Sequence, residues 1–331
     1  MTQAAVPMVE VWRGGRVESV HAGHAVVCDA RGAVLEAWGD PDKVIWPRSS
    51  CKMVQALPLV ESGAAEGLDS TLLALACASH QGAAVHTNRV AGWLASLGLD
   101  DSALRCGAHI PHDRATAEAL IRAGGAPAQL HNNCSGKHAG FVALARRLGA
   151  GPEYIDPDHP VQRAVRTAFE EVTGGPSPGW AIDGCSAPNF ATTVAGLARA
   201  MAAFAAAGAG GGARDTAMVR LRDAMLAHPD LVAGEGRACT GLMRAMAGRA
   251  AVKTGAEGVF VAILPEQRLG VAVKIADGAG RAAEVAIAAL LARLGALDAS
   301  MPGAAHWLAP PVDNWRGLRT GHIAPAPGFP G

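Results

Sequence analysis

Strand-forming patterns are confined to the two ends of this 331-residue chain. Near the start, residues 6–13 and 16–36 alternate between apolar and polar side chains and are rich in valine, which is typical of two or three antiparallel strands. Near the end, strands are predicted at 250–253, 257–264 and 269–276, and the last two have the spacing of a hairpin. A sheet that contains all of these strands must therefore pair segments that lie far apart in the sequence.

The region between these strands has the periodicity of helices, starting from a serine-rich segment after Pro47 that suits a helix N-cap. Helices are expected at 49–62, 70–78, 84–97, 115–123, 138–149, 159–173, 189–207, 214–227 and 239–248. A further helix is expected at 279–295, and the tail from 301 to 331 is expected to be loop with one edge strand near 313–322.

The economical architecture closes the two chain ends into one antiparallel sheet, packs the terminal helix on it and inserts a helical domain, which gives an α+β fold. The corresponding domains are a discontinuous sheet domain, 1–60 with 250–331, and a mainly helical domain, 61–249. Periodicity does not prove which strands pair, so this pairing is a prediction.

Charge and hydropathy limit the classes of function. Lysine plus arginine and aspartate plus glutamate each number 29, so no nucleic acid or anionic membrane is expected as a partner. No apolar run reaches the roughly 18 residues that a membrane span needs, and the start shows no secretory signal pattern. The seven cysteines are odd in number and form no Cys-x-x-Cys pair, which favours reduced thiols. We therefore expect a cytoplasmic protein.

Lysine is scarce in this chain, and its five lysines are Lys43, Lys52, Lys137, Lys253 and Lys274. Arginine keeps its proton in proteins, whereas a desolvated lysine can lose its proton and act as a base. Chance placement is favoured for Lys43 and Lys274. The other three lie in small polar motifs that carry candidate chemistry.

The first motif is Ser49-Ser50-Cys51-Lys52, at a predicted helix start. Ser49 and Lys52 are three residues apart and would share one helix face. A neutral lysine can take the proton of a serine hydroxyl and make it a nucleophile, and the helix N-terminus favours the negative charge that develops. Taken alone, the motif is weak evidence, because a capping serine beside a surface lysine is the more common explanation.

The second motif, Lys253-Thr254-Gly255, follows a predicted strand. Ser-x-x-Lys followed late in the chain by Lys-Thr-Gly is the paired signature of serine β-lactamases and penicillin-binding proteins. Their third element, Ser-Asp-Asn, is absent from this sequence. Ser79, in the segment CASHQG, is the candidate replacement for its serine.

Two polar loops each precede a predicted helix and each contain a cysteine. They are HNNCSGKH at 131–138, with Cys134, and DGCSAPN at 183–189, with Cys185. Two thiolates with a nearby lysine, histidine or aspartate could hold a zinc ion with one position open to water. The alternative is two unrelated loop cysteines.

The order of these motifs resembles the asparaginase II family, the rhizobial-type L-asparaginases, from about residue 8 to about residue 320. The segments that carry the resemblance are RSSCKMVQALPLV, ASHQG, HNNCSGKHAGF, DGCSAPNFA, AGEGRACTGLM, KTGAEGVFV and VKIADG. The resemblance implies a fold like serine β-lactamases and glutaminases, a homodimer, and a zinc site made from two cysteines and one lysine.

The resemblance also assigns residues to these roles. It implies two serine–lysine pairs, Ser49 with Lys52 and Ser79 with Lys253. It implies Zn²⁺ ligands at Cys134, Lys137 and Cys185, with Asp183 close by. A lysine ligand must be neutral, and the residues alone would favour His138 or Asp183 as the third ligand. The expected substrate-binding residues are Arg48, His80, Asn133, His138 and Asp183.

The resulting hypothesis is hydrolysis of L-asparagine to L-aspartate and ammonia, with Ser49 attacking the side-chain amide and Lys52 as its base. Two other functions stay open. Lys253-Thr254-Gly255 would also suit a penicillin-recognising serine acyl enzyme, although the missing Ser-Asp-Asn opposes it. The second alternative is a non-enzymatic protein of the same fold that senses zinc or an amino acid.

Overall fold

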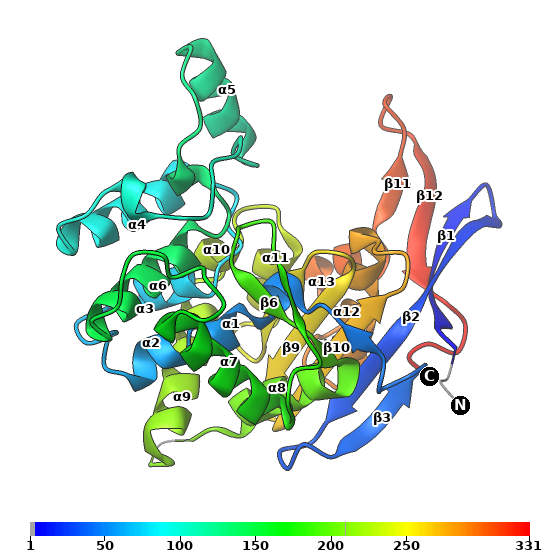
Figure 1. The fold of residues 1–331 in the computed structure, drawn as a ribbon. Helices are drawn as coiled ribbons and strands as arrows, with labels where there is room; N and C mark the ends of the chain where they lie inside the picture. The colour runs from blue at the N-terminus through cyan, green and yellow to red at the C-terminus, as the bar shows by residue number, and fades with distance from the viewer. Residues whose placement is uncertain (1–3, 209) are drawn as a thin grey trace. The chain divides into compact units, whose positions relative to one another are not determined.

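The strands at the two ends of the chain do join in one antiparallel sheet. The computed structural model describes residues 4–208 and 210–331, and it orders the sheet β11-β12-β1-β2-β10-β9-β8, with β3 paired to β2. Figure 1 shows the blue N-terminal strands beside the orange and red C-terminal ones. The bounds are β1 (Val6–Arg13), β2 (Arg16–Cys28), β3 (Val34–Trp38), β8 (Ala251–Gly255), β9 (Val259–Leu264), β10 (Leu269–Ile275), β11 (Pro311–Asp313) and β12 (Arg319–Pro325). The predicted α+β class is confirmed.

The central pairing is between β2 and β10, where Val27 lies opposite Val271 in an antiparallel register. Every residue of β9 is buried, so this strand is covered on both faces. The covering helices include α8 (Val194–Ala206), which packs on β10 and β2, and α12 (Gly280–Arg293), which packs on β9 and β10. A Cβ on Gly270 would lie 2.0 Å from the backbone nitrogen of Ala202, so only glycine allows α8 this close to the sheet.

The chain divides into two compact units, whose limits differ from the predicted domains. Unit 1 holds the chain up to Ser50, Ala191–Ala206 and Gly241–Gly331. Unit 2 holds Cys51–Phe190 and Ala207–Thr240. The segment Ala191–Ala206, expected in the helical domain, belongs to unit 1 because α8 is one of the helices that cover the sheet.

Unit 2 is mainly helical, and its helices enclose an apolar interior. Short 3-10 helices, η2 (Asp101–Ala103) and η3 (Gln129–His131), and one small hairpin, β5 (Trp180–Ile182) with β6 (Pro188–Phe190), complete it. The helices are α1 (Lys52–Gln55), α2 (Leu57–Glu61), α3 (Ser70–Ala76), α4 (Ala84–Ser96), α5 (Arg114–Arg122), α6 (Ser135–Arg147), α7 (Pro160–Thr173), α9 (Gly212–Ala227) and α10 (Pro229–Val232). None of the described helices is both long and apolar enough to cross a membrane.

Three predictions about local structure were wrong. The helix expected at 189–207 begins only at Val194, because Pro188–Phe190 and Thr192–Thr193 form strands. The helix expected at 49–62 is divided into η1 (Arg48–Cys51), α1 and α2, because Pro58 lacks an N–H and its ring interferes with the preceding turn. The tail contains a helix, α13 (Pro302–Leu308), and the β11–β12 hairpin, where one edge strand was expected. The remaining elements are α11 (Ala238–Ala245) and a two-stranded pair, β4 (Val44–Ile45) with β7 (Thr192–Thr193). All seven cysteines lie among the described residues, where they are buried thiols outside any disulfide.

Candidate active site

Lys52 is buried in unit 2, with 1% of its surface exposed. Its Nζ donates to the carbonyl of Ala78 and, at 3.5 Å, to the carbonyl of Asn133. These bonds offset part of the cost of removing a charged amine from water. Because Ala78 precedes Ser79, they place the Lys52 amine beside the backbone of two predicted site segments, CASHQG and HNNCSGKH.

Ser79 and His80 are held at this place by their backbones. The Ser79 N–H donates to Val232 at 2.9 Å, and the His80 N–H donates to the Asn133 carbonyl at 3.2 Å. The His80 ring accepts from the Gly82 N–H at 3.1 Å through Nδ1, and its Nε2 lies 2.9 Å from the Ser135 hydroxyl. Burial, followed by the charge of His86, holds the pKa of His80 well below its usual value. Both ring nitrogens of His80, an expected substrate-binding residue, therefore have hydrogen-bond partners inside the protein.

Cys134, Lys137 and Cys185 come together in unit 2. Cys134 and Lys137 lie at the start of α6, and the loop between β5 and β6 brings Cys185 within 3.0 Å of the Lys137 Nζ. Cys134 hydrogen-bonds to Cys185, and its sulfur is also 3.0 Å from Oδ1 of Asn133. Each of the three is no more than 3% exposed. The predicted metal-binding side chains thus form one buried cluster.

The charges in this cluster are unequal. The hydrogen bond from Cys134, and then the Lys137 ammonium, hold the pKa of the Cys185 thiol well below its usual range despite burial. The same bond and burial raise the pKa of Cys134 to about 12. Burial lowers the pKa of Lys137, but the nearby Cys185 and Cys134 outweigh it and raise that pKa above its usual value. These directions favour a Lys137 ammonium facing a Cys185 thiolate.

The donor set of this cluster fits zinc, which prefers sulfur and nitrogen ligands. Among the described residues, no group of three or more His, Cys, Asp or Glu side chains is placed to hold a metal. Within the cluster, Lys137 supplies the nitrogen donor beside the two sulfurs, and its role as a ligand stays a prediction.

Asp183 and Asn133 border the cluster. The Asp183 N–H donates to the Ala187 carbonyl at 2.9 Å, and its Oδ1 accepts from the Gly184 N–H at 2.7 Å, which closes the loop around Cys185. Ser186 in this loop has a φ of 68°, a conformation that non-glycine residues rarely adopt. Such strain is commonly found at functional sites.

In unit 1, the segment around Ser49 lies against the end of β8. Arg48 has a φ of 53°, Ser49 is half-buried, and the buried Ser50 hydroxyl donates to the Pro47 carbonyl at 2.7 Å. A Cβ on Gly255 would lie 2.6 Å from that carbonyl, so the Lys-Thr-Gly motif needs its glycine for this approach.

Lys253, in the same strand, has no exposed surface, and its Nζ donates to the Thr254 carbonyl at 2.9 Å. Ser49 and Lys253 thus belong to unit 1, whereas Lys52 and Ser79 belong to unit 2. The two serine–lysine pairings remain predictions.

Two residues of this region were missed from the sequence. His109 accepts a hydrogen bond from the Asn133 N–H at 3.0 Å through Nε2, and the hydroxyl of Tyr154 lies 3.0 Å from Nδ1 of His138. The polar, proline-containing segment GAHIPHD was a usable signal for His109. Tyr154 also lines an apolar pocket of about 330 Å³. None of the predicted site residues lines that pocket, so it does not mark the active site.

Gly136 allows the cysteine-bearing end of α6 to pack on α3, since a Cβ there would lie 2.4 Å from the Leu75 carbonyl oxygen. We expect Gly136→Ala to lower the free energy of unfolding by about 1–3 kcal/mol, because the clash is with rigid backbone, and to impair the activity proposed below. Gly140→Ala on the same helix is the matched control, because its Cβ would meet side chains only, Leu59 at 3.3 Å, Trp93 at 3.6 Å and Ala76 at 3.8 Å. Equal losses in both variants, measured by urea denaturation, would contradict this role of Gly136.

A sequence profile described as L-asparaginase II matches residues 9–325, and a search of curated proteins returns no match. Among solved structures, the chain is similar to a β-lactamase from Mycobacterium bovis, with 15% identity and a TM-score of 0.40 over 79% of this chain and 89% of that one. It is also similar to a structure from Bacteroides dorei provisionally described as a β-lactamase, with 13% identity and a TM-score of 0.42 over 77% and 87%. Both likenesses are too distant to carry an argument about function. The profile match spans nearly the whole sequence, and the chain therefore belongs to the L-asparaginase II family.

Proposed function

We propose that this protein hydrolyses the side-chain amide of L-asparagine to L-aspartate and ammonia. The observation that carries the proposal is the buried Lys52 amine, held beside the backbone of Ser79 and Asn133 in a chain of the L-asparaginase II family. A lysine without water around it is suited to lose and regain a proton during a reaction.

In the proposed reaction, neutral Lys52 takes the proton of Ser49, whose oxygen attacks the amide carbon. Backbone N–H groups near Ser49 stabilise the negative oxygen that forms. Ser79 with Lys253 passes a proton to the leaving nitrogen, which departs as ammonia, and water then releases L-aspartate from the Ser49 ester. We propose Arg48, Asn133, His138 and Asp183 as the residues around the amino-acid part of the substrate. The buried cysteine thiols support a reducing cytoplasmic location, and the family resemblance supports a homodimer.

The test is ammonia release from L-asparagine and L-glutamine by the purified protein, with a chromogenic cephalosporin as the third substrate. Ammonia from asparagine supports the proposal and dismisses a non-enzymatic sensor. Turnover of the cephalosporin without ammonia release would favour the penicillin-recognising enzyme. Discrimination against one extra methylene is worth only about 1–3 kcal/mol, so measurable glutamine turnover is compatible with the proposal.

We further propose that Cys134, Lys137 and Cys185 bind Zn²⁺, which would supply a Lewis acid near the substrate. The charges of the metal-free cluster then set the pH dependence. The raised pKa values of Cys134 and Lys137 keep a proton on each near neutral pH, whereas the lowered pKa of Cys185 favours its thiolate form. Binding through all three must release about two protons. Zinc affinity should therefore rise about 100-fold per pH unit near neutrality, measured with a competing chelator, and a pH-independent affinity would contradict this ligand set.

The ligand set can also be tested by substitution. Cys134→Ser and Cys185→Ser each remove a soft ligand at nearly constant size, so both variants should lose most of their bound zinc by metal analysis. Cys106→Ser is the matched control, because Cys106 is a buried neighbour of the cluster whose pKa is raised to about 12 by burial and then by Cys134 and Cys185. Retention of zinc by both ligand variants would remove the metal from the proposal and leave the serines and lysines standing.

A further inference from the structure

Tyr154 is the single tyrosine of the chain, and only 1% of its surface is exposed. Its hydroxyl accepts a hydrogen bond from the Arg105 backbone N–H at 2.7 Å and lies 3.0 Å from Nδ1 of His138. All three residues belong to unit 2. A phenylalanine would fill nearly the same space, so packing alone does not explain the Tyr154 hydroxyl.

The direction of the Tyr154–His138 hydrogen bond follows from counting donors and acceptors. A phenol has one hydrogen to donate, and burial raises the pKa of Tyr154, which keeps that hydrogen in place. If Nδ1 carried a proton, both the tyrosine hydrogen and the His138 Nε2 lone pair would be buried without partners. If Tyr154 donates to a bare Nδ1, only the proton on Nε2 is left over. The second arrangement leaves fewer buried polar groups unpaired and is favoured.

The remaining group, Nε2 of His138, is buried and has no hydrogen-bond partner among the described residues. With Nδ1 accepting from Tyr154, the proton of the ring is on Nε2, so the ring presents one N–H donor there. A buried donor without an acceptor is costly, so its presence on a ring near Lys137 and Lys52 indicates a ligand that accepts from it.

We propose that Tyr154 is a positioning residue that fixes His138 as the Nε2–H tautomer, so that His138 donates a hydrogen bond to the α-carboxylate of the amino-acid substrate; this inference rests on the proposed function. The α-amine is excluded as the partner, because an ammonium group offers only donors. A carboxylate is favoured because a charge-assisted hydrogen bond is the stronger kind. The titratable groups that act on the ring are Lys137, Cys134, Lys52 and Asp183.

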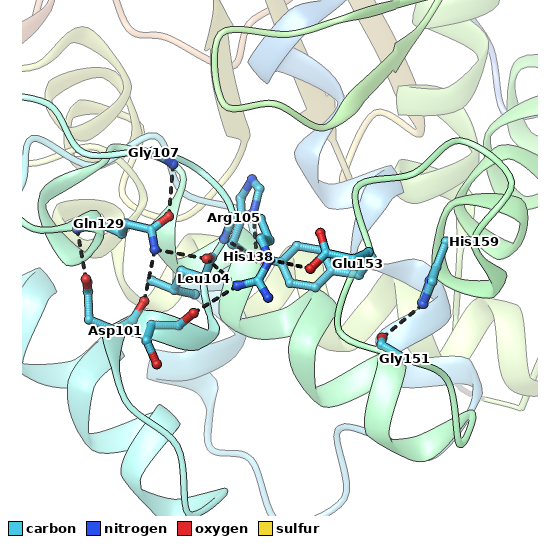
Figure 2. Close-up of polar contacts among 11 residues, drawn as sticks. Asp101, Leu104, Arg105, Gly107, Gln129, His138, Gly151, Glu153 and His159 are labelled. Atoms are coloured by element: carbon cyan, nitrogen blue, oxygen red, sulfur yellow. Dashed lines mark hydrogen bonds and ion pairs between the residues drawn. The ribbon is translucent and has the colours of Figure 1, made fainter.

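The segment that carries the Arg105 N–H is held by hydrogen bonds with the Gln129 side chain, as Figure 2 shows. Nε2 of Gln129 donates to the carbonyls of Asp101 at 3.1 Å and Leu104 at 2.9 Å, and its Oε1 accepts from the Gly107 N–H at 3.0 Å. The Arg105 side chain pairs with Glu153 at 3.0 Å. The segment from 101 to 107 therefore forms a rigid support for the Tyr154 hydroxyl.

The same tautomer bears on the metal. A ring nitrogen that carries a proton has no lone pair for zinc, so His138 cannot bind a metal through Nε2 while Tyr154 donates to Nδ1. This removes His138 as the alternative third ligand and favours Lys137.

The first test measures the tautomer directly. The protein is labelled with ¹⁵N-histidine, and the His138 signals are assigned by comparison with His138→Gln. We expect a protonated Nε2 and a bare Nδ1 in the ligand-free wild type, and a mixture of tautomers in Tyr154→Phe. A protonated Nδ1 in the wild type would overturn the proposal. This measurement needs neither activity nor a stable variant.

The second test is kinetic, with folding checked by circular dichroism. His138→Asn removes the N–H from the Nε2 position, and we expect the KM for asparagine to rise about tenfold or more with little change in kcat. His138→Gln keeps an N–H near that position and should recover most of the loss. Tyr154→Phe should raise KM severalfold. An unchanged KM in His138→Asn, or a loss confined to kcat, would overturn the carboxylate assignment. If the wild type released no ammonia at all, the proposed function would fail, while the ¹⁵N measurement would still decide the tautomer.

Discussion

Ser49→Ala is expected to lower kcat by at least about 10³-fold while the protein stays folded. Losing an activated nucleophile removes the covalent route entirely. A half-exposed hydroxyl at a helix start contributes at most about 2 kcal/mol to stability as a cap. Steady-state ammonia release and thermal unfolding measure the two effects separately. More than about a tenth of wild-type activity in Ser49→Ala would contradict the nucleophile assignment.

The neighbouring serine supplies the control. Ser50 is buried and its hydroxyl donates to the Pro47 carbonyl at 2.7 Å, so Ser50→Ala should cost about 1 kcal/mol of stability and retain most of the activity. The opposite result, an inactive Ser50→Ala beside an active Ser49→Ala, would move the nucleophile to Ser50.

Lys52→Arg and Lys253→Arg are each expected to be nearly inactive, with kcat reduced by at least about 10²-fold. Arginine preserves the positive charge but cannot give up its proton to become a base. Both lysines are almost fully buried, so the larger, planar guanidinium also has to displace its neighbours, and folding must be checked for each variant.

Lys43→Arg is the control for these substitutions, because Lys43 is exposed and should tolerate the change with full activity. Substantial activity in Lys52→Arg would show that Lys52 acts only as a positive charge. The same result in Lys253→Arg would exclude it from proton transfer.

The broad fold was predictable from the sequence because valine-rich alternation marks buried strands, and such patterns were found only near the two ends. The hairpin of β9 and β10 was correctly identified from its spacing. The placement of α8 was not predictable, since its helical pattern does not say which surface it covers. Gly270 allows α8 to pack closely on the sheet because it has no side chain. A single glycine in a strand is, however, equally typical of a bulge or a tight bend.

Part of the site was also predictable. Cys134, Lys137 and Cys185 do lie together, although their chemistry alone left His138 and Asp183 open as alternatives. The role of His80 within the fold was not predictable, because its partners are the Gly82 N–H and the Ser135 hydroxyl. Tyr154 lies outside every polar motif, and only three-dimensional contacts connect it to His138.

The pairing of β2 with β10 has a consequence for how the protein is made. Gly23 lies opposite Ile275, so the N-terminal strands leave the ribosome long before their partner exists. During that interval they are strands with unpaired edges, which are prone to associate with other chains. Unit 2 is completed earlier, at Thr240, and its helices rely more on local contacts. Closing the sheet joins distant segments and is a slow kind of step. Synthesis of this chain therefore sets a waiting time during which a chaperone that shields the first strands should raise the yield of folded protein.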